Sequence, residues 1–252
     1  MRAPAVLSLL CASLLLPAHA APVPPPAASA PAREPSVQAL LDVLKTGVGP
    51  EVLQARRALL ERGSEALEAL RQADRGRLPA MARAQFTWLH GALGDASAAD
   101  LLTGRLEDPN PLVREEACRA LGRIRAASAA PKLRDLLKDG EILVQEAAAR
   151  ALGRLGDAES AGDLCALLED AHQSVSLRAA AAEALGLLEP ARVRASLVGA
   201  LRRDPSAVVR RAAVDSLRRM TGMDRCYDPE AAEPQREAAT KSWEEWLAEQ
   251  GG

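Results

Sequence analysis

The sequence predicts an all-α solenoid, a right-handed superhelix of about six stacked helical hairpins that ends in a further, C-terminal helix. Two observations lead to this fold class. Hydrophobic residues make up 48% of the 252 residues but aromatic residues only 2%, so the core must consist of Ala, Leu and Val. Small aliphatic side chains let helices approach closely, whereas a β-sandwich would favour β-branched and aromatic ones. In addition, one helical segment recurs at intervals of about 32 residues, which is typical of repeat architectures.

The first twenty residues have the pattern of a secretory signal peptide. Arg2 supplies a positive charge, residues 5–16 form a short apolar stretch, and the sequence AHA at 18–20 is a small-residue cleavage site. The alternatives are a buried N-terminal helix and a lipoprotein anchor at Cys11, but Leu10 before that cysteine is bulky. The stretch is too short to span a bilayer, and no later segment is long and apolar enough to do so. We therefore expect a periplasmic or secreted protein without a transmembrane segment.

The rest of the chain divides into three parts. Residues 21–35 (APVPPPAASAPAREP) form a Pro/Ala-rich linker that cannot bury a core. Helical periodicity with breaks at Gly and Pro begins at Ser36. We expect the solenoid to occupy residues 36–220, with divergent repeats in 36–94 and clear repeats in 95–220, and a capping segment in 221–252.

Four segments align as the second helix of a hairpin. They are LVREEACRALGRI (112–124), LVQEAAARALGRL (143–155), SLRAAAAEALGLL (176–188) and VVRRAAVDSLRRM (208–220). Their matching leucines are Leu121, Leu152, Leu185 and Leu217. In the divergent part, Leu60 and Leu93 are expected at the same position, with first helices at 36–47 and 64–73. One hairpin cannot bury its apolar face alone, so neighbouring hairpins must stack.

The repeated segment resembles the HEAT repeat family, in particular the short bacterial HEAT-like repeats related to phycobilisome lyases. The shared marks are V-R-x-x-A-x-x-A-L-G in the second helix and an aspartate six residues before the arginine, as in Asp108/Arg114 and Asp204/Arg210. The resemblance is strong over 95–220 and looser over 36–94. It implies that the second helices line the concave face of the solenoid.

The aspartate and the arginine of this motif have a predicted structural role. We expect the aspartate to cap the second helix, with Pro109 or Pro205 at its first position. The arginine can then pair with an aspartate of its own or a neighbouring unit, which gives an Asp/Arg ladder along the stack. The ladder is expected to be incomplete, because Asp139 precedes Gln145 and Asp170 stands eight residues before Arg178. Its predicted members are Asp108, Arg114, Asp204 and Arg210.

The C-terminal segment resembles the end of many bacterial HEAT-repeat proteins, in which an L-T-G-x-x-x-x-Y-D-P turn leads to a Trp-bearing helix. Here MTGMDRCYDP (220–229) precedes Trp243, Trp246 and Leu247, which share one helix face at i, i+3 and i+4. We expect this stripe to cover the exposed end of the last hairpin, as terminal repeats require. An aromatic binding patch is the alternative.

No pattern in the sequence indicates catalysis, a cofactor or a metal site, so we expect a protein that is not an enzyme. Neither His90 nor His172 has a second histidine or a cysteine at metal-ligand spacing. Cys118 and Cys165 lie two hairpins apart and repeats contact only their neighbours, so a disulfide between them is not expected. We interpret Cys118 as a small buried hydrophobic residue and leave the roles of Cys165 and Cys226 open.

The net charge of −2 argues against a nucleic-acid partner. Residues 221–252 hold eight Asp/Glu against three Lys/Arg, and the remaining mature chain is only slightly positive. Neither part has the strong basic excess expected of nucleic-acid binders.

The candidate binding surface lies on the second helices. Counted from the repeat leucine as zero, positions −6, −2 and +2 project away from the core. The candidate residues are Arg119, Arg123, Arg150, Arg154 and Arg219. Such a cationic track could hold an acidic peptide, a carboxylate-bearing glycan or lipid headgroups. The alternative is a solvated face, because Glu115–Arg119 and Glu146–Arg150 are i,i+4 pairs of about 0.2–0.5 kcal/mol each.

Phe86, Trp88 and His90 form a second group of interest, because the chain has few other aromatic residues. In the register set by Leu93, Phe86 stands where later units carry Arg or Gln. These rings are either an interface hot spot or a filling between irregular early repeats.

Three functional hypotheses remain. The leading one is a non-catalytic scaffold of the cell envelope whose concave face binds a protein or peptide partner. The resemblance implies a second, a bilin-lyase-like enzyme, although export argues against chemistry that belongs inside the cell. The third is binding of anionic lipid or glycan at the envelope surface, which would weaken sharply with rising salt. The fold alone does not decide among them.

Overall fold

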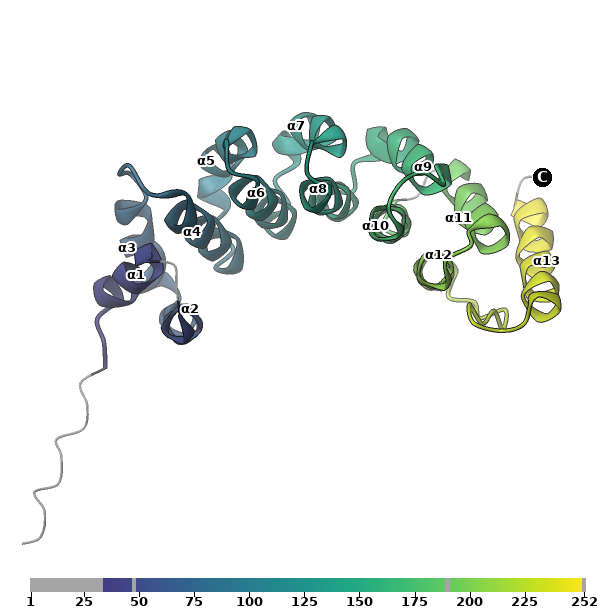
Figure 1. Cartoon of the computed structure of the whole chain (residues 1–252), viewed down its shortest axis with the longest axis horizontal. Coiled ribbons are helices and arrows are strands. Elements are labelled where there is room, and N and C mark those ends of the chain that lie inside the picture. Colours follow the sequence, from purple (N-terminus) through teal and green to yellow (C-terminus); the bar gives the residue numbers. More distant parts are fainter. Residues whose placement is uncertain (1–33, 47–48, 189–190, 251–252) are drawn as a thin grey trace, which may run out of the picture. The chain divides into compact units, whose positions relative to one another are not determined.

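The structure is a computed structural model, and it describes residues 34–46, 49–188 and 191–250 (Figure 1). The expected signal peptide and all but the last two residues of the expected linker lie outside the described residues. Contacts within the chain separate residues 35–252 as one compact unit. The described residues of this unit are almost entirely helical and include no β-strand, which confirms the all-α solenoid.

Six hairpins and one further helix follow one another in the described residues. The first helices are α1 (Val37–Thr46), α3 (Ser64–Ala73), α5 (Ala99–Gly104), α7 (Ala130–Asp135), α9 (Ala161–Glu169) and α11 (Ala191–Arg203). The second helices are α2 (Pro50–Arg62), α4 (Ala80–Ala92), α6 (Pro111–Ile124), α8 (Ile142–Leu155), α10 (Val175–Leu185) and α12 (Ala207–Thr221). Short 3₁₀ turns extend α5, α7 and α9, and the last helix is α13 (Glu233–Gln250).

The second helices form a continuous layer from α4 onward. Each packs against the next, in the order α4, α6, α8, α10 and α12, and the first helices α5, α7, α9 and α11 lie along one side of this layer (Figure 1). The first hairpin departs from this order, because α1 rather than α2 supplies most of the packing against α4.

Glycine at the end of the repeated motif brings neighbouring second helices together. A methyl group on Gly122 would lie 3.0 Å from the Cα of Ala151, and one on Gly153 would lie 2.7 Å from the Cα of Ala184. These distances are shorter than ordinary contacts, so only glycine allows the observed spacing. The A-L-G motif therefore sets the closeness of the layer, while its leucine fills the core.

The repeat register of the early units differs from the expected one. Arg83 and Gly91 stand seven residues before and one residue after His90, as Arg114 and Gly122 do around Leu121. His90 rather than Leu93 thus occupies the repeat position. The assignment of Leu60 was also wrong, because its side chain is 39% exposed whereas the neighbouring Leu59 is fully buried.

This substitution of histidine for leucine coincides with a division of the core. One cluster of buried apolar side chains runs from Val37 to Leu89, and a second runs from Ala98 to Trp246. His90 lies in sequence between the two and is 1% exposed. A polar layer therefore separates the first two hairpins from the remaining ones.

The aspartates of the motif do not cap the second helices. Asn110 is the N-cap of α6, where its side chain accepts a hydrogen bond from the backbone N–H of Leu112 at 2.9 Å, and Pro111 is the first helical residue. Ser206 caps α12 in the same way. Asp108 accepts instead from the backbone N–H of Asn110, so it holds the turn before the helix. The predicted caps were wrong by two residues, because the aspartate binds the turn before the helix and the residue two positions later caps the helix.

The C-terminal segment packs as the capping interpretation expects. Helix α13 packs against α11, and Trp243 and Trp246 are buried with their rings edge to face at 5.6 Å between centroids. The hydroxyl of Tyr227 donates to the backbone oxygen of Leu201 at 2.7 Å, which ties the preceding turn to α11.

Candidate functional site

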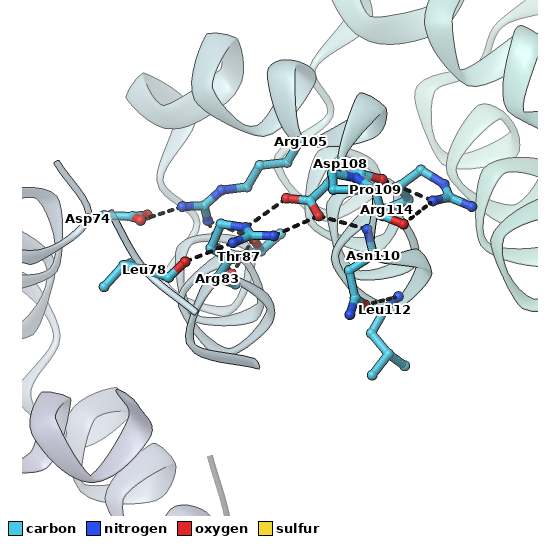
Figure 2. Close-up of polar contacts among 10 residues, drawn as sticks. All are labelled: Asp74, Leu78, Arg83, Thr87, Arg105, Asp108, Pro109, Asn110, Leu112 and Arg114. Carbon is cyan, nitrogen blue, oxygen red and sulfur yellow. Dashed lines mark hydrogen bonds and ion pairs between the residues drawn. The ribbon is translucent and has the colours of Figure 1, made fainter. Parts of the chain in front are cut away.

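The Asp/Arg ladder connects neighbouring units at the loops before the second helices (Figure 2). Arg83 donates two hydrogen bonds to Asp108, at 2.7 and 2.9 Å, and a third to the backbone oxygen of Leu78. Arg114 does the same one unit later, with Asp139 at 2.9 and 2.8 Å and the backbone oxygen of Asp108 at 2.9 Å. Each arginine therefore joins its own loop to the aspartate of the following unit.

The ladder is interrupted once and then resumes. Gln145 reaches the backbone oxygen of Asp139 but has no bond to Asp170. Arg178 pairs with Asp204 at 2.8 and 3.1 Å, and both side chains are almost fully buried. Arg210 ends the series on backbone oxygens, including that of Pro229 at 2.6 Å. All four predicted members thus lie in the ladder, and every side-chain pair is between units rather than within one.

A buried charge network occupies the polar layer around His90. Its ring nitrogens lie 2.8 Å (Nδ1) from Asp95 and 2.9 Å (Nε2) from Asp74. Arg71 donates to Asp95 at 2.6 and 3.1 Å, and Arg105 donates to Asp74. The ring of His90 thus bridges the carboxyl groups of Asp74 and Asp95 through its two nitrogens.

The environment of Asp95 fixes its charge. Burial alone would raise the pKa of its carboxyl group, but hydrogen bonds from Arg71, Ser97 and His90 outweigh this effect and hold the pKa well below its usual range. His90 and Asp95 are 1% and 2% exposed, so the centre of the network is closed to solvent, whereas Arg71 reaches the surface.

The aromatic group beside it fills space rather than forming a hot spot. Phe86 is fully buried in the N-terminal core cluster, and His90 belongs to the charge network. Trp88 is half-buried, and the guanidinium of Arg56 lies over its ring at 4.3 Å from the centroid. Arg56 also donates to Gln85, so α2 covers this end of the second-helix layer.

Two of the five candidate arginines are neutralised by neighbouring carboxylates. Arg119 pairs with Glu115 at 2.5 Å and with Glu116 at 3.1 Å. Arg150 pairs with Glu146 on its own helix and, at 2.8 Å, with Glu183 on α10. The solvated-face explanation therefore fits Arg119 and Arg150, whose charges support the layer itself.

The other three candidates differ from them. Arg123, Arg154 and Arg219 are exposed, and none forms an ion pair with a carboxylate among the residues that the structure describes. Arg123 and Arg154 follow one another on α6 and α8 and border an open depression of about 580 Å³. Its remaining lining residues are Gly122, Arg125, Gly153, Leu155, Gly156 and Leu187. Arg219, on α12, does not line it.

The two arginines at the depression carry like charges in a partly enclosed place. Burial lowers the pKa of Arg123, Glu116 opposes this effect, and the positive charges of Arg154 and Arg119 lower the pKa further. An anionic group placed between Arg123 and Arg154 would relieve this repulsion. The depression is thus the part of the predicted arginine track that favours an anionic ligand.

The cysteines and the possible metal ligands give no further site. Cys118, Cys165 and Cys226 are free thiols, of which the first two are buried and the third is exposed. Burial raises the pKa of the Cys118 thiol, as expected for a packing residue. Across 34–46, 49–188 and 191–250 no three His, Cys, Asp or Glu residues are placed to share a metal ion. None of the helices in these ranges has the length and apolar character needed to cross a membrane.

Two features escaped the sequence analysis. The His90 network was hidden by a register error of three residues, and the spacing of Arg83 to Gly91, equal to that of Arg114 to Gly122, could have corrected it. The pairing of Arg150 with a glutamate 33 residues away could not have been found from local spacing.

Comparison with known proteins gives a consistent picture of the fold. Residues 67–142, 136–218 and 163–248 each match the profile of HEAT repeats, and together they cover more than half of the chain. No curated protein sequence matches the chain.

Solved structures with the same architecture show low sequence identity to this chain. The complex of CpcE and CpcF of phycocyanin lyase from Nostoc sp. PCC7120 is similar with a TM-score of 0.56 and 23% identity, covering 86% of this chain and 89% of that one. An engineered protein is similar with a TM-score of 0.53 and 22% identity, covering 74% and 90%. At these identities the likeness concerns the fold alone.

Proposed function

This chain belongs to the HEAT-repeat family, and on that premise we propose that it is a non-catalytic scaffold that binds a protein partner on its second-helix layer. Stacked hairpins provide a long surface of fixed shape, which suits protein partners. The observation that carries the proposal is the pair Arg123 and Arg154, which border an open depression and form no ion pair in the described part of the chain. We propose that this pair binds acidic side chains of the partner.

The absence of catalysis is part of the proposal. His90, the histidine with the most polar surroundings, is closed off from solvent by its two aspartates. The second expectation from the sequence, a bilin-lyase-like enzyme, stays a prediction. Visible absorbance of protein purified from its native host would reveal a bound bilin and favour that alternative.

The proposed place of action is the cell envelope. Its support is the signal-peptide pattern of residues 1–20. N-terminal sequencing of the protein from fractionated cells tests it, because cleavage after residue 20 would leave Ala21 as the first residue. An uncleaved chain in the cytoplasmic fraction would contradict it.

Crosslinking of the mature protein in its native envelope tests the binding surface. The test variant is Arg123→Glu/Arg154→Glu, and the matched control is Arg192→Glu/Arg203→Glu, which reverses two exposed arginines on α11 in the other layer. We expect one dominant crosslinked protein, lost in the test variant and kept in the control. Its affinity for the purified scaffold should fall with rising salt, because the contact is ionic.

Two other results would redirect the proposal. A crosslinked protein that persists in the test variant would show that the arginine pair is not the binding site. If no protein is captured but the mature chain binds anionic vesicles or acidic glycan, the third hypothesis from the sequence would replace the scaffold.

A further inference from the structure

The second helices carry a row of exposed apolar side chains at their first turns. Met81, Leu112, Leu143 and Val208 occupy position −9 of α4, α6, α8 and α12, and their exposed fractions are 43%, 45%, 55% and 58%. Only α10 has a polar residue there, and its neighbour Val175 is 42% exposed. Isolated exposed apolar residues need no explanation, but four at the same position of their units do.

This row lies on the same side of the helices as the arginine pair. At about 100° per residue, positions −9, −2 and +2 all point to the side opposite the repeat leucine. On α6 these positions are Leu112, Arg119 and Arg123, and on α8 they are Leu143, Arg150 and Arg154. Position −9 is separated from +2 by about 16 Å, or three turns.

Positions −9, −2 and +2 form one stripe on α6 and one on α8, and the arginine in the middle of each stripe is already paired. Arg119 and Arg150 are each paired with two glutamates, so the band at −2 offers no free positive charge. Each stripe on α6 and α8 thus has an apolar start, a middle whose arginine is already paired, and at its end an arginine that forms no ion pair with any described residue. Between the two ends lies the depression that Arg123 and Arg154 border.

We infer that the partner presents an α-helix that lies antiparallel to α6 and α8, with carboxylates in its first turn at Arg123 and Arg154 and apolar side chains three turns later at Leu112 and Leu143. A helix fits because its own side chains repeat after eleven residues with nearly the same direction and the same rise of about 16 Å. This inference rests on the proposed function and specifies its partner.

The antiparallel direction follows from electrostatics. The C-terminal ends of α6 and α8 carry the negative pole of the helix dipole, and the N-terminal end of a partner helix carries the positive pole. Acidic side chains are also most favourable in the first turn of their own helix. In the antiparallel arrangement the partner's helix dipole attracts those of α6 and α8, and its carboxylates attract the two arginines. The dipole of a parallel helix would instead be repelled.

Two synthetic helical peptides of the same composition test the inference. One carries two glutamates in its first turn and two leucines three turns later in an alanine-rich background, and the other has the two groups exchanged. Binding to the mature protein is measured by fluorescence anisotropy. We expect the first peptide to bind about tenfold more tightly or better, because only its order matches both ends of the stripes.

Three variants of the protein complete the experiment. Leu112→Ser/Leu143→Ser and Arg123→Glu/Arg154→Glu should each weaken binding of the first peptide about tenfold. Only in the arginine variant should rising salt no longer weaken binding. Leu101→Ser is the control, because Leu101 is 42% exposed on α5 in the other layer. All these side chains are exposed, so circular dichroism should show an intact fold in every variant.

The outcomes separate the inference from the proposed function. Equal binding of the two peptides, or no effect of the leucine changes, overturns the antiparallel helix while the arginine site stands. If the arginine changes have no effect on a peptide that binds, the proposed function falls as well. Failure of both peptides to bind at millimolar concentration overturns the inference, and the crosslinking experiment then decides the proposed function alone.

Discussion

At the scale of single residues, the charges around His90 decide how the first hairpins are joined to the rest. The repeat position there holds an imidazole between two aspartates where other units hold a leucine. A leucine would have made the core continuous, whereas the polar residues must all find partners because burial of an unpaired charge is costly. The network is complete in this respect, with Arg71 and Arg105 on the outer oxygens of the two aspartates.

The first prediction concerns the pH dependence of this network. The folded-state pKa of Asp95 is held below its unfolded value, so its contribution is fully present above about pH 4 and is lost as the pH falls through the folded-state value. Asp95→Asn should therefore lower the free energy of unfolding by about 1–3 kcal/mol at pH 7. The difference from the wild type should shrink towards pH 3, as measured by urea unfolding.

The exposed residue Asp42 provides the control. It forms a surface pair with Lys45 at 2.8 Å, so Asp42→Asn should leave the urea midpoint almost unchanged at both pH values. An Asp95→Asn protein with wild-type stability at pH 7 would mean that the network contributes nothing to folding.

The second prediction uses the gap in the ladder. Gln145 stands 25 residues before Asp170, the same separation as Arg114 and Asp139, which do pair. Gln145→Arg should complete the ladder and raise the free energy of unfolding by about 0.5–1.5 kcal/mol. Arg114→Gln should lower the free energy of unfolding by about 1–3 kcal/mol, because it leaves the carboxylate of Asp139 without its arginine. Thermal unfolding followed by circular dichroism measures both, and a destabilised Gln145→Arg protein would show that Asp170 is not free to accept the new arginine.

At the scale of the helices, glycine controls the distance between neighbouring second helices. The loops control how far each hairpin is displaced along the next. Gly153 allows α8 and α10 to touch through their backbones, while the Arg/Asp pairs fix how far each hairpin is displaced along the next. These are independent constraints, one at the last turn of the second helix and one before its first turn.

The third prediction compares two helical glycines. Gly153→Ala should lower the free energy of unfolding by about 1–3 kcal/mol, because the new methyl group would meet the backbone of Ala184 and force α8 and α10 apart. Gly199→Ala on α11 is the matched control, since its methyl group would meet only the flexible end of Arg203. There the helix propensity of alanine should stabilise the protein by up to about 1 kcal/mol. We expect the urea midpoint to fall in Gly153→Ala and to rise in Gly199→Ala, each relative to the wild type. A stabilised Gly153→Ala protein would contradict the close approach of α8 and α10.

At the scale of the whole unit, stability depends on how the last hairpin of the stack is covered. Each hairpin is supported by its neighbours, so the last one must be covered from outside. Helix α13 does this with two buried tryptophans against α11, while Arg202 and Glu244 form an exposed pair at the same contact.

The fourth prediction tests this end. Trp243→Ala should lower the free energy of unfolding by about 3–5 kcal/mol, because a fully buried large side chain is lost. Hydrogen exchange should show the loss of protection first in α11 to α13, while α6 and α8 stay protected. Leu53→Ala is the control, since Leu53 is 68% exposed and should have almost no effect. Uniform loss of protection along the chain would show that the unit unfolds as a whole and not from its end.

The sequence by itself determined the architecture, because the helices of each hairpin follow from residues that are close together in the sequence. The recurring Leu and Ala positions gave the hairpins, and the Trp243/Trp246 stripe gave the covered end. The same local logic led to errors where a residue served a distant partner. Asp108 was taken for a helix cap, and the role of His90 was missed because the repeat position was assigned to Leu93.

Only the tertiary structure decided which charges are free. Arg123 and Arg119 lie one turn apart on the same helix face and look equivalent in the sequence, yet Arg119 is held by Glu115 and Glu116 while Arg123 faces an open depression. Arg150 likewise is neutralised by a glutamate from the next unit. Whether a charge is available depends on side chains brought close by the stacking of repeats, and that proximity has no counterpart in the spacing along the chain.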